Sequence, residues 1–345
     1  MQSEALHEHR FFCILENPNI NEKPTSKQPN MRLCLQPSFY LFALAVWMPA
    51  AAFVGQCPTA SGVALQVLGS GGPIADDGRA SAAYLVWVDG KSRVLIDAGG
   101  GSFLRFAEAG ADFRDLDFVG LSHFHADHSA DFPALLKSAS FSKRERALIV
   151  AGPDGSDLFP GLNRFLESLF DRESGAFAYL AGYLDGEGEL PKLAAFEIDS
   201  ENIGPVTVLG DSGSSLQIDT LHVPHGIVPS LAFRVRAGDK ILVFASDQNG
   251  SKREFVDFAR DADALVMHMP VPEDVRGVGR RLHAPPSVIG TIADSANAGM
   301  LIISHLMARS LRDLDANVEL LRSEFGGSIH VAEDLRCYEL KAQED

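Results

Sequence analysis

The stretch that decides the fold is Phe118–Asp131, which reads Phe-Val-Gly-Leu-Ser-His-Phe-His-Ala-Asp-His-Ser-Ala-Asp. The residues before Ser122 have the apolar pattern of a buried strand, and Asp131-Phe132-Pro133 is typical of the first turn of a helix. Between them lie four side chains that can ligate a metal ion: His123, His125, Asp127 and His128. Imidazole and carboxylate groups suit a zinc-like divalent ion. The pattern therefore predicts a metal site on a tight loop at the carboxyl end of a strand. A surface loop that is rich in histidine by chance is the alternative, and four ligand-type residues in six positions disfavour it.

The His-x-His-x-Asp-His string resembles the signature of the metallo-β-lactamase fold superfamily. Three further segments resemble its branch of ribonuclease Z and arylsulfatase-like phosphodiesterases, namely Leu-Gly-Ser-Gly-Gly-Pro (68–73), Leu-Ile-Asp-Ala-Gly-Gly-Gly (95–101) and Ile-Ser-His-Leu (303–306). The resemblance runs from about Val63 to the C-terminus. It implies an α/β fold, a four-layer αββα sandwich of two related halves in one domain. It does not identify the substrate, because this fold hosts many hydrolytic chemistries.

The rest of the chain also predicts two related, strand-rich halves. Residues 82–97 form a predicted hairpin around Asp89-Gly90, and residues 231–245 form another around Gly238-Asp239. Each hairpin is followed by an aspartate, so we expect Asp247 to be the counterpart of Asp97. Helices are predicted outside the strands, at 102–109, 131–140, 162–170, 177–184, 287–298 and 311–325. Residues 152–192 are the least regular part.

Four motif residues cannot complete the coordination of two ions, so further ligands are expected at later strand ends. His225, Asp247 and His305 each follow a predicted strand. By resemblance, one zinc ion would be held by His123, His125 and His225, and the other by Asp127, His128 and His305. Asp247 would bridge the two ions, and manganese or iron could replace zinc. A histidine at a strand end, taken alone, is more often a capping or packing residue.

The expected chemistry follows from two ions about 3.5–4 Å apart, which convert a bridging water into a hydroxide that attacks an ester. Asp127 would orient this nucleophile as well as bind metal. By resemblance, Asp97 is the buried aspartate that positions the metal loop, and His283 is the histidine that assists the leaving group. A surface-loop histidine is the alternative for His283. His222 and His268 either line the pocket or satisfy hydrogen bonds of the core, and we favour the core.

The composition disfavours a nucleic-acid polymer as partner. The formal net charge is −16, and residues 1–52 contribute nothing to it because their four acidic and four basic groups cancel. A negative field repels polyanions. Residues 152–192, where ribonuclease Z carries its tRNA-gripping arm, hold eight acidic and three basic residues. Met269 stands where tRNA-processing members have a glutamate, which also disfavours tRNA cleavage. A small-molecule ester is the expected partner.

The N-terminal residues predict export. Met31-Arg32 opens a short basic segment, residues 39–48 form the apolar core of a signal peptide, and Pro49-Ala50-Ala51-Ala52 resembles a cleavage site. The core is too short to span a bilayer comfortably, so no stable membrane span is expected after cleavage. We therefore expect an extension and signal peptide over 1–52, a hydrolase domain over 53–345, and a periplasmic or secreted protein. Either Met1 or Met31 can be the start.

Two cysteines, Cys57 and Cys337, would remain after cleavage at Ala52, because Cys13 and Cys34 precede that site. An oxidising compartment allows a disulfide between them. Two unrelated thiols are the alternative.

The leading functional hypothesis is an exported dinuclear zinc hydrolase that cleaves a small phosphodiester or sulfate ester by attack of a metal-bridging hydroxide. A lactonase or other acyl hydrolase on the same metal site is the first alternative. A non-enzymatic metal-binding periplasmic protein is the second, and the complete ligand set argues against it. β-Lactam hydrolysis is disfavoured, because Asp247 replaces the cysteine or histidine arrangements of those enzymes.

Overall fold

The structure, a computed structural model, describes Cys57 and residues 61–340, and these residues form two seven-stranded sheets. The strand order of the first sheet is β14 (Cys337–Leu340), β1 (Val63–Gly69), β2 (Ala83–Val88), β3 (Lys91–Ile96), β4 (Phe118–Gly120), β5 (Ile149–Pro153), β6 (Ala194–Ile198). The order of the second is β13 (Ser328–Val331), β12 (Met300–Ser304), β11 (Ala264–His268), β10 (Lys240–Phe244), β9 (Val228–Ala237), β8 (Leu216–His225), β7 (Val206–Leu209). Within the described part, no helix is long and apolar enough to cross a membrane.

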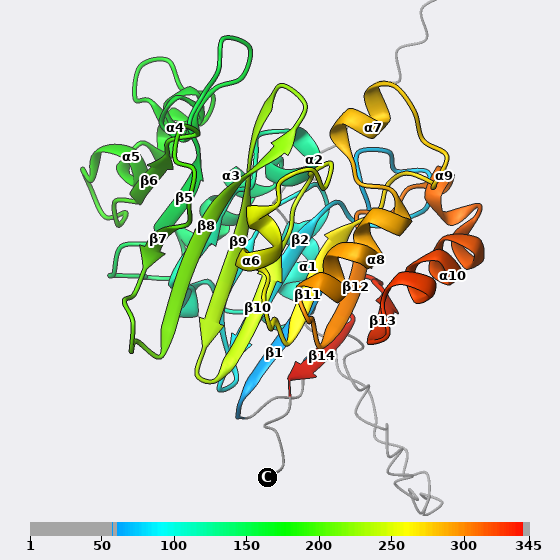
Figure 1. Ribbon diagram of the computed structural model, residues 1–345. Coiled ribbons are helices and arrows are strands. Elements are labelled where there is room, and N and C mark those ends of the chain that lie inside the picture. Colours follow the sequence, from blue (N-terminus) through cyan, green and yellow to red (C-terminus); the bar gives the residue numbers. More distant parts are fainter. Residues whose placement is uncertain (1–56, 58–60, 341–345) are drawn as a thin grey trace, which may run out of the picture. The chain divides into compact units, whose positions relative to one another are not determined.

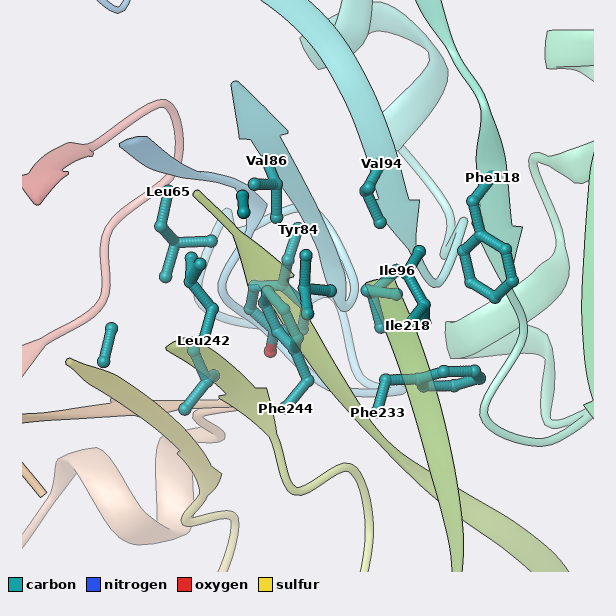
Figure 2. Close-up of a cluster of buried hydrophobic side chains, with 14 of the residues drawn as sticks. Leu65, Tyr84, Val86, Val94, Ile96, Phe118, Ile218, Phe233, Leu242 and Phe244 are labelled. Carbon is teal, nitrogen blue, oxygen red and sulfur yellow. The ribbon is translucent and has the colours of Figure 1, made fainter. Parts of the chain in front are cut away.

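The two sheets pack face to face through their apolar side chains. Strands β8 and β9 alternate between buried and partly exposed residues near both ends, as expected where one face of a sheet is covered more completely than the other. Figure 2 shows side chains of the first sheet, such as Tyr84 and Phe118, meeting Phe233 and Phe244 of the second. The rings of Phe118 and Phe233 lie edge to face, with centroids 6.0 Å apart. This inner core fixes the two sheets against each other.

Helices cover the outer face of each sheet (Figure 1). The first sheet packs against α1 (Ser102–Glu108), α3 (Phe132–Ala139) and α4 (Leu162–Phe170). The second packs against α6 (Glu254–Phe258), α8 (Pro286–Ser295) and α10 (Leu314–Glu324). Smaller pieces are α2 (Ala126–Ser129), α5 (Gly182–Asp185), α7 (Val278–Leu282), α9 (Ala308–Leu311) and the 3₁₀ turns Phe113–Asp115 and Ala178–Leu180. The expected αββα sandwich is thereby confirmed.

The sheets have the same internal plan, since β1 to β3 and β8 to β10 pair antiparallel while β3 to β6 and β10 to β13 pair parallel. The register corrects one expectation. Ile96 pairs with Gly120, and Phe244 pairs with Val266 in the other half. Asp97 therefore corresponds to Ala245, and Asp247 lies two residues beyond the position equivalent to Asp97.

Some elements differ from the sequence-based expectation. Residues 177–184 form a single 3₁₀ turn followed by the four-residue α5 instead of one helix. The expected helix 311–325 is present as α10 but begins three residues later, at Leu314, and the separate short helix α9 ends at Leu311. Strands β6 and β7 were not predicted. Both lie at sheet edges and β6 is largely exposed, so their sequences lack the apolar alternation of buried strands.

The two ends of the folded region are tied together. Cys57 and Cys337 form a disulfide with 5.5 Å between their Cα atoms, across 280 residues of chain. The bridge joins the segment before β1 to β14, the neighbour of β1 in the first sheet. The expected signal peptide, its cleavage after Ala52 and the domain boundary at 52/53 lie outside the described residues.

Candidate metal centre

The ligand-type residues gather at the carboxyl ends of four strands. His123 and His125 follow β4, His225 is the last residue of β8, Asp247 follows β10 and His305 follows β12. His305 has a φ of 53°, a left-handed conformation that is uncommon outside glycine and that turns the chain sharply where β12 ends. Together with Asp127 and His128, the seven residues expected from the sequence lie in one cluster, in which only His125 is more than slightly exposed.

We expected Asp127 and His128 to lie on a tight loop, but the structure places both in a short helix. A short helix, α2, begins at Ala126, immediately after His125, which is extended with φ of −65° and ψ of 147°. The change from extended to helical backbone turns Asp127 and His128 away from the direction of the preceding histidines. One stretch of six residues can therefore supply ligand atoms to two neighbouring positions.

The first group of ligand atoms consists of three imidazole nitrogens. Nitrogens of His123, His125 and His225 all lie within 4.8 Å of one another. The Nδ1 of His225 donates to the backbone oxygen of Leu282 (2.9 Å), which leaves the Nε2 lone pair facing the cluster. Burial lowers the pKa of His123 well below its usual value and also lowers that of His125. Both rings are thus neutral, as metal ligands must be.

The second group is built around Asp127. Its Oδ2 lies 3.0 Å from Nε2 of His305 and 3.6 Å from Nε2 of His128. Burial opposes the charge of Asp127, but the hydrogen bond with His305 and nearby histidines outweigh it and lower the pKa to about 2. The carboxylate is therefore ionised at neutral pH.

Asp247 lies between the two groups. Its Oδ2 is 3.5 Å from Nε2 of His225, and its Oδ1 is 3.6 Å from Nε2 of His305. Burial disfavours its charge, yet the surrounding histidines hold its pKa well below the usual range. Its Oδ2 also lies 3.8 Å from Nε2 of His128. One carboxylate thus lies close to imidazoles of both groups, as a bridging ligand must.

Asp97 holds the metal loop from behind. It is fully buried and accepts hydrogen bonds from the backbone N–H of Ser122 (2.7 Å) and from its hydroxyl (2.9 Å). Nδ1 of His128 donates to the same carboxylate at 2.8 Å. These bonds fix the imidazole so that its Nε2 faces Asp127 and Asp247. The sequence expectation that Asp97 positions the loop matches these contacts.

The chemistry of the cluster fits divalent cations. Nε2 of His128 and Nε2 of His225 are buried without a hydrogen-bond partner among the described residues. Buried polar atoms normally have partners, so unpartnered imidazole nitrogens that face carboxylates need an explanation. Burial disfavours the charge of His128, but Asp97, Asp247 and Asp127 outweigh it and raise its pKa to about 9. Such a concentration of negative charge would be balanced by a bound cation that displaces this proton.

His268 belongs to the site more closely than the sequence indicated. Its Nδ1 lies 2.7 Å from Oδ1 of Asp247, and its Nε2 is hydrogen-bonded to the hydroxyl of Tyr84 at 2.8 Å. The Tyr84 hydroxyl donates to Oγ of Ser304 at 2.9 Å. This buried chain fixes the orientation of Asp247. We expected His268 to be a buried residue that satisfies hydrogen bonds of the core. It is buried, but the sequence did not reveal that it orients Asp247, because its partner Tyr84 lies 184 residues away.

Two glycines of the quoted segments allow the site to close. A Cβ on Gly72 would lie 2.9 Å from the His305 ring, and a Cβ on Gly99 would lie 2.1 Å from the backbone oxygen of Asp127. Gly72 also donates its N–H to the backbone oxygen of Leu306 (3.2 Å), so the 68–73 loop lies directly against the segment that carries His305. A side chain at either position would displace a ligand.

A cavity of about 520 Å³ opens onto the cluster. Its lining includes His125, Asp127, His225, Asp247, His283, His305, Pro73, Leu282, Met307 and Arg309. The structure places His283 in this lining, with its Nδ1 3.8 Å from Oδ2 of Asp247. Burial, only partly offset by Asp247, lowers the pKa of His283 to about 3. His222, by contrast, lies outside this lining and outside the groups of ligand atoms.

Comparison with known proteins assigns the family. Residues 76–282 match the model of the metallo-beta-lactamase superfamily. Among similar proteins, ribonuclease Z of Methanosarcina acetivorans is 24% identical over 299 residues, covering 79% of this chain and 96% of that protein. Ribonuclease Z of Mycobacterium bovis is 27% identical over 290 residues, covering 80% and 98%. The resemblance to the ribonuclease Z branch is thereby confirmed, while arylsulfatase-like activity stays a prediction.

Solved structures show the same fold. The metallo-beta-lactamase fold protein YhfI from Bacillus subtilis matches with a TM-score of 0.59 and 23% identity, covering 80% of this chain and 99% of that one. The short form of human tRNase Z matches with a TM-score of 0.61 and 16% identity, covering 81% and 100%. A diphosphatase of the PhnP family matches with a TM-score of 0.57 and 17% identity, covering 81% and 98%. The chain belongs to the metallo-beta-lactamase superfamily and is a metal-dependent hydrolase of that fold.

Proposed function

We propose that the chain is an exported hydrolase that holds two zinc ions and cleaves a small phosphodiester or sulfate ester. The observation that carries the proposal is the position of Asp247, whose carboxylate lies 3.5 Å from Nε2 of His225 in one group and 3.6 and 3.8 Å from Nε2 of His305 and His128 in the other. A site for a single ion would not need two sets of buried imidazoles around the same carboxylate. Manganese or iron could take the place of zinc in such a site.

The residues that would hold the ions divide as the geometry groups them. One ion would be bound by His123, His125 and His225, the other by Asp127, His128 and His305, with Asp247 shared. When bound, a pair of divalent ions makes water nucleophilic near neutral pH and polarises an ester oxygen. His268 and Asp97 would keep two of these ligands in place through the bonds described above.

The protein's own groups supply orientation and proton transfer. Asp127 is ionised and faces the cavity, so it can accept a hydrogen bond from the water that attacks the ester. His283 lies in the cavity wall on the side of Asp247 and can protonate the alcohol that leaves. Its low pKa in the metal-free chain means that it needs a nearby negative charge to become protonated. An anionic ester would provide that charge.

Charge and size favour a small substrate. The relatives are named as ribonucleases, and RNA is a phosphodiester, which supports the type of bond. The net charge of −16 and the eight acidic residues of 152–192 disfavour a long polyanion. A cavity of about 520 Å³ suits a small ester. Export rests on the apolar core at 39–48 and the small residues before Phe53.

A panel of substrates tests the proposal. Zinc-loaded protein would be assayed with a bis-aryl phosphate, an aryl sulfate and an acyl lactone, with Asp247→Asn as the control. We expect turnover of the phosphate or the sulfate that depends on zinc and falls sharply in the variant. Turnover of the lactone alone would contradict the proposal in favour of an acyl hydrolase. Zinc binding without turnover of any of the three esters would favour a metal-binding protein.

A further inference from the structure

Several exposed apolar side chains lie on segments next to the metal site. Nine large apolar side chains are exposed in the described part of the chain, and four of them lie on segments that border the cavity or its ligands. These four are Ile74 (51% exposed), Leu158 (74%), Ile227 (69%) and Val278 (60%). They come from four separate segments of the chain, each of which adjoins a residue of the cavity or of the ligand cluster. Exposed apolar surface beside a pocket often marks a ligand-binding groove.

The contacts of neighbouring residues locate these side chains at the cavity mouth. Ile74 directly follows Pro73, which lines the cavity. Ile227 lies two residues after His225, in a turn where a Cβ on Gly226 would lie 2.7 Å from Leu282. The turn therefore lies against the residue that closes α7 and lines the cavity.

The remaining two lie on two further segments next to the cavity or its ligands. Val278 begins α7 and stands one turn before Leu282, in a helix that has no buried residue. Figure 1 shows α7 at the end of the sandwich where the β8–β9 hairpin turns. Leu158 precedes Phe159, whose ring centroid lies 5.9 Å from that of His125. Apolar surface thus borders the site both at α7 and at the 155–161 loop.

The apolar surface continues from the rim into the cavity. Leu282, Met307 and Pro73 line the same cavity as the ligand-type residues. A molecule in this cavity can therefore contact both the ligands and apolar side chains. Apolar groups that leave water in such contacts favour binding in proportion to the area they bury.

We infer that the substrate is an amphiphile, an ester whose anionic centre enters the ligand cluster while an extended alkyl or aryl group lies on the rim. The inference rests on the proposed function and names the class of substrate for it. In the reaction water supplies the new bond to phosphorus or sulfur. The bond to the leaving alcohol breaks, and that alcohol departs with a proton.

A membrane surface is a weaker candidate for the occupant. The chain carries a net charge of −16, which opposes approach to an anionic bilayer. The apolar residues also surround a cavity of about 520 Å³ and are continuous with its wall, which suits a group attached to the reacting ester. A single soluble ester can fill the cavity and also contact the apolar residues around it.

A homologous series of nitrophenyl alkyl phosphates tests the inference. Methyl, butyl and octyl members share one leaving group, so a difference between them reports the apolar group alone. Below the micelle threshold, we expect kcat/KM to rise about two- to fourfold per added methylene over the first few carbons, the upper figure being full burial of the group. Most of the gain should be in KM, because the apolar contact is the same before and during the reaction.

The double variant Ile227→Ser, Val278→Ser should lose most of the preference for octyl over methyl. The matched control is Phe141→Ser, which removes a side chain that is 75% exposed just beyond the C-terminal end of α3 and away from the cavity. The control should keep the full preference. Zinc content would be measured in both, so that damage to the ligand cluster is recognised separately.

Each other outcome overturns the inference. Turnover of all members at equal kcat/KM would refute the apolar contact and leave the proposed function intact. A double variant that keeps the octyl preference would refute the location. A rate that rises only when zwitterionic vesicles are added would assign the rim to a membrane. Failure to cleave any member, with zinc bound, would overturn both the inference and the proposed phosphodiesterase activity.

Discussion

Replacing Asp97 by asparagine should weaken metal binding while preserving the shape of the site. Asp97 accepts three hydrogen bonds, two from Ser122 and one from Nδ1 of His128, at 2.7 to 2.9 Å. An asparagine has one oxygen fewer, so its amide N–H₂ must face either Ser122 N–H or His128. In the first case two donors oppose each other. In the second, His128 must carry its proton on Nε2, the nitrogen that points at Asp127.

The size of the effect follows from these bonds. A hydrogen bond to a charged group contributes about 1.5–3 kcal/mol. The tautomer of His128 that can bind zinc through Nε2 carries its proton on Nδ1. If the lost hydrogen bond is the one that this tautomer makes, the energy of that bond is subtracted from the free energy of zinc binding. At about 1.4 kcal/mol per factor of ten, zinc should bind roughly 10- to 100-fold more weakly, which is also the usual effect of losing the residue that orients a histidine ligand.

Competitive titration with a chromophoric chelator measures this affinity on metal-free protein. The matched control is Asp219→Asn, the same chemical change at another buried aspartate, which accepts hydrogen bonds from Arg234 (2.7 Å) and Thr207 (2.7 Å) on the second sheet. The control should lower the unfolding temperature and leave zinc affinity unchanged. Zinc affinity of Asp97→Asn within twofold of the parent would refute the role assigned to Asp97.

Three further changes have defined outcomes. Gly99→Ala should abolish zinc retention, because its Cβ would lie 2.1 Å from a backbone oxygen of α2. Gly100→Ala, whose Cβ would have its nearest neighbour at 3.9 Å, should retain zinc. Equal zinc content in the two purified variants would count against this packing. Denatured, unreduced protein should show no titratable thiol at Cys57 or Cys337, and two free thiols would contradict the bridge. Removal of the bridge should lower the free energy of unfolding by up to about 5 kcal/mol in the chain-entropy model. His283→Ala should lose about 10²–10⁴-fold on an alkyl phosphodiester and far less on a nitrophenyl ester, since nitrophenolate leaves without an acid; equal losses would assign His283 to binding.

Much of this fold could be predicted because its elements carry local signals. The hairpin around Asp89-Gly90 appears as β2 and β3, and the 162–170 helix has the expected bounds. The ligand-type residues could be found for the same reason. His225 and His305 each follow an apolar strand, and strand ends of a layered fold meet in space.

The remaining features depend on contacts between distant residues. The hydrogen bonds from Asp247 through His268 to Tyr84 join the loop after β10 to β11 and β2, and no local pattern marks such a chain. Helix α2 is four residues long and is held by Ala98, which donates to the backbone oxygen of His128 at 2.8 Å. Its helical state therefore comes from tertiary packing, and sequence reasoning treats so short a segment as a loop.

Zinc stoichiometry tests the dinuclear site most directly. Elemental analysis of the purified, active protein would be compared with that of Asp247→Ala, which removes the carboxylate lying between the two histidine groups. We expect close to two zinc ions per chain in the parent and a loss of at least one in the variant. One ion or fewer in fully active parent protein would contradict the dinuclear site.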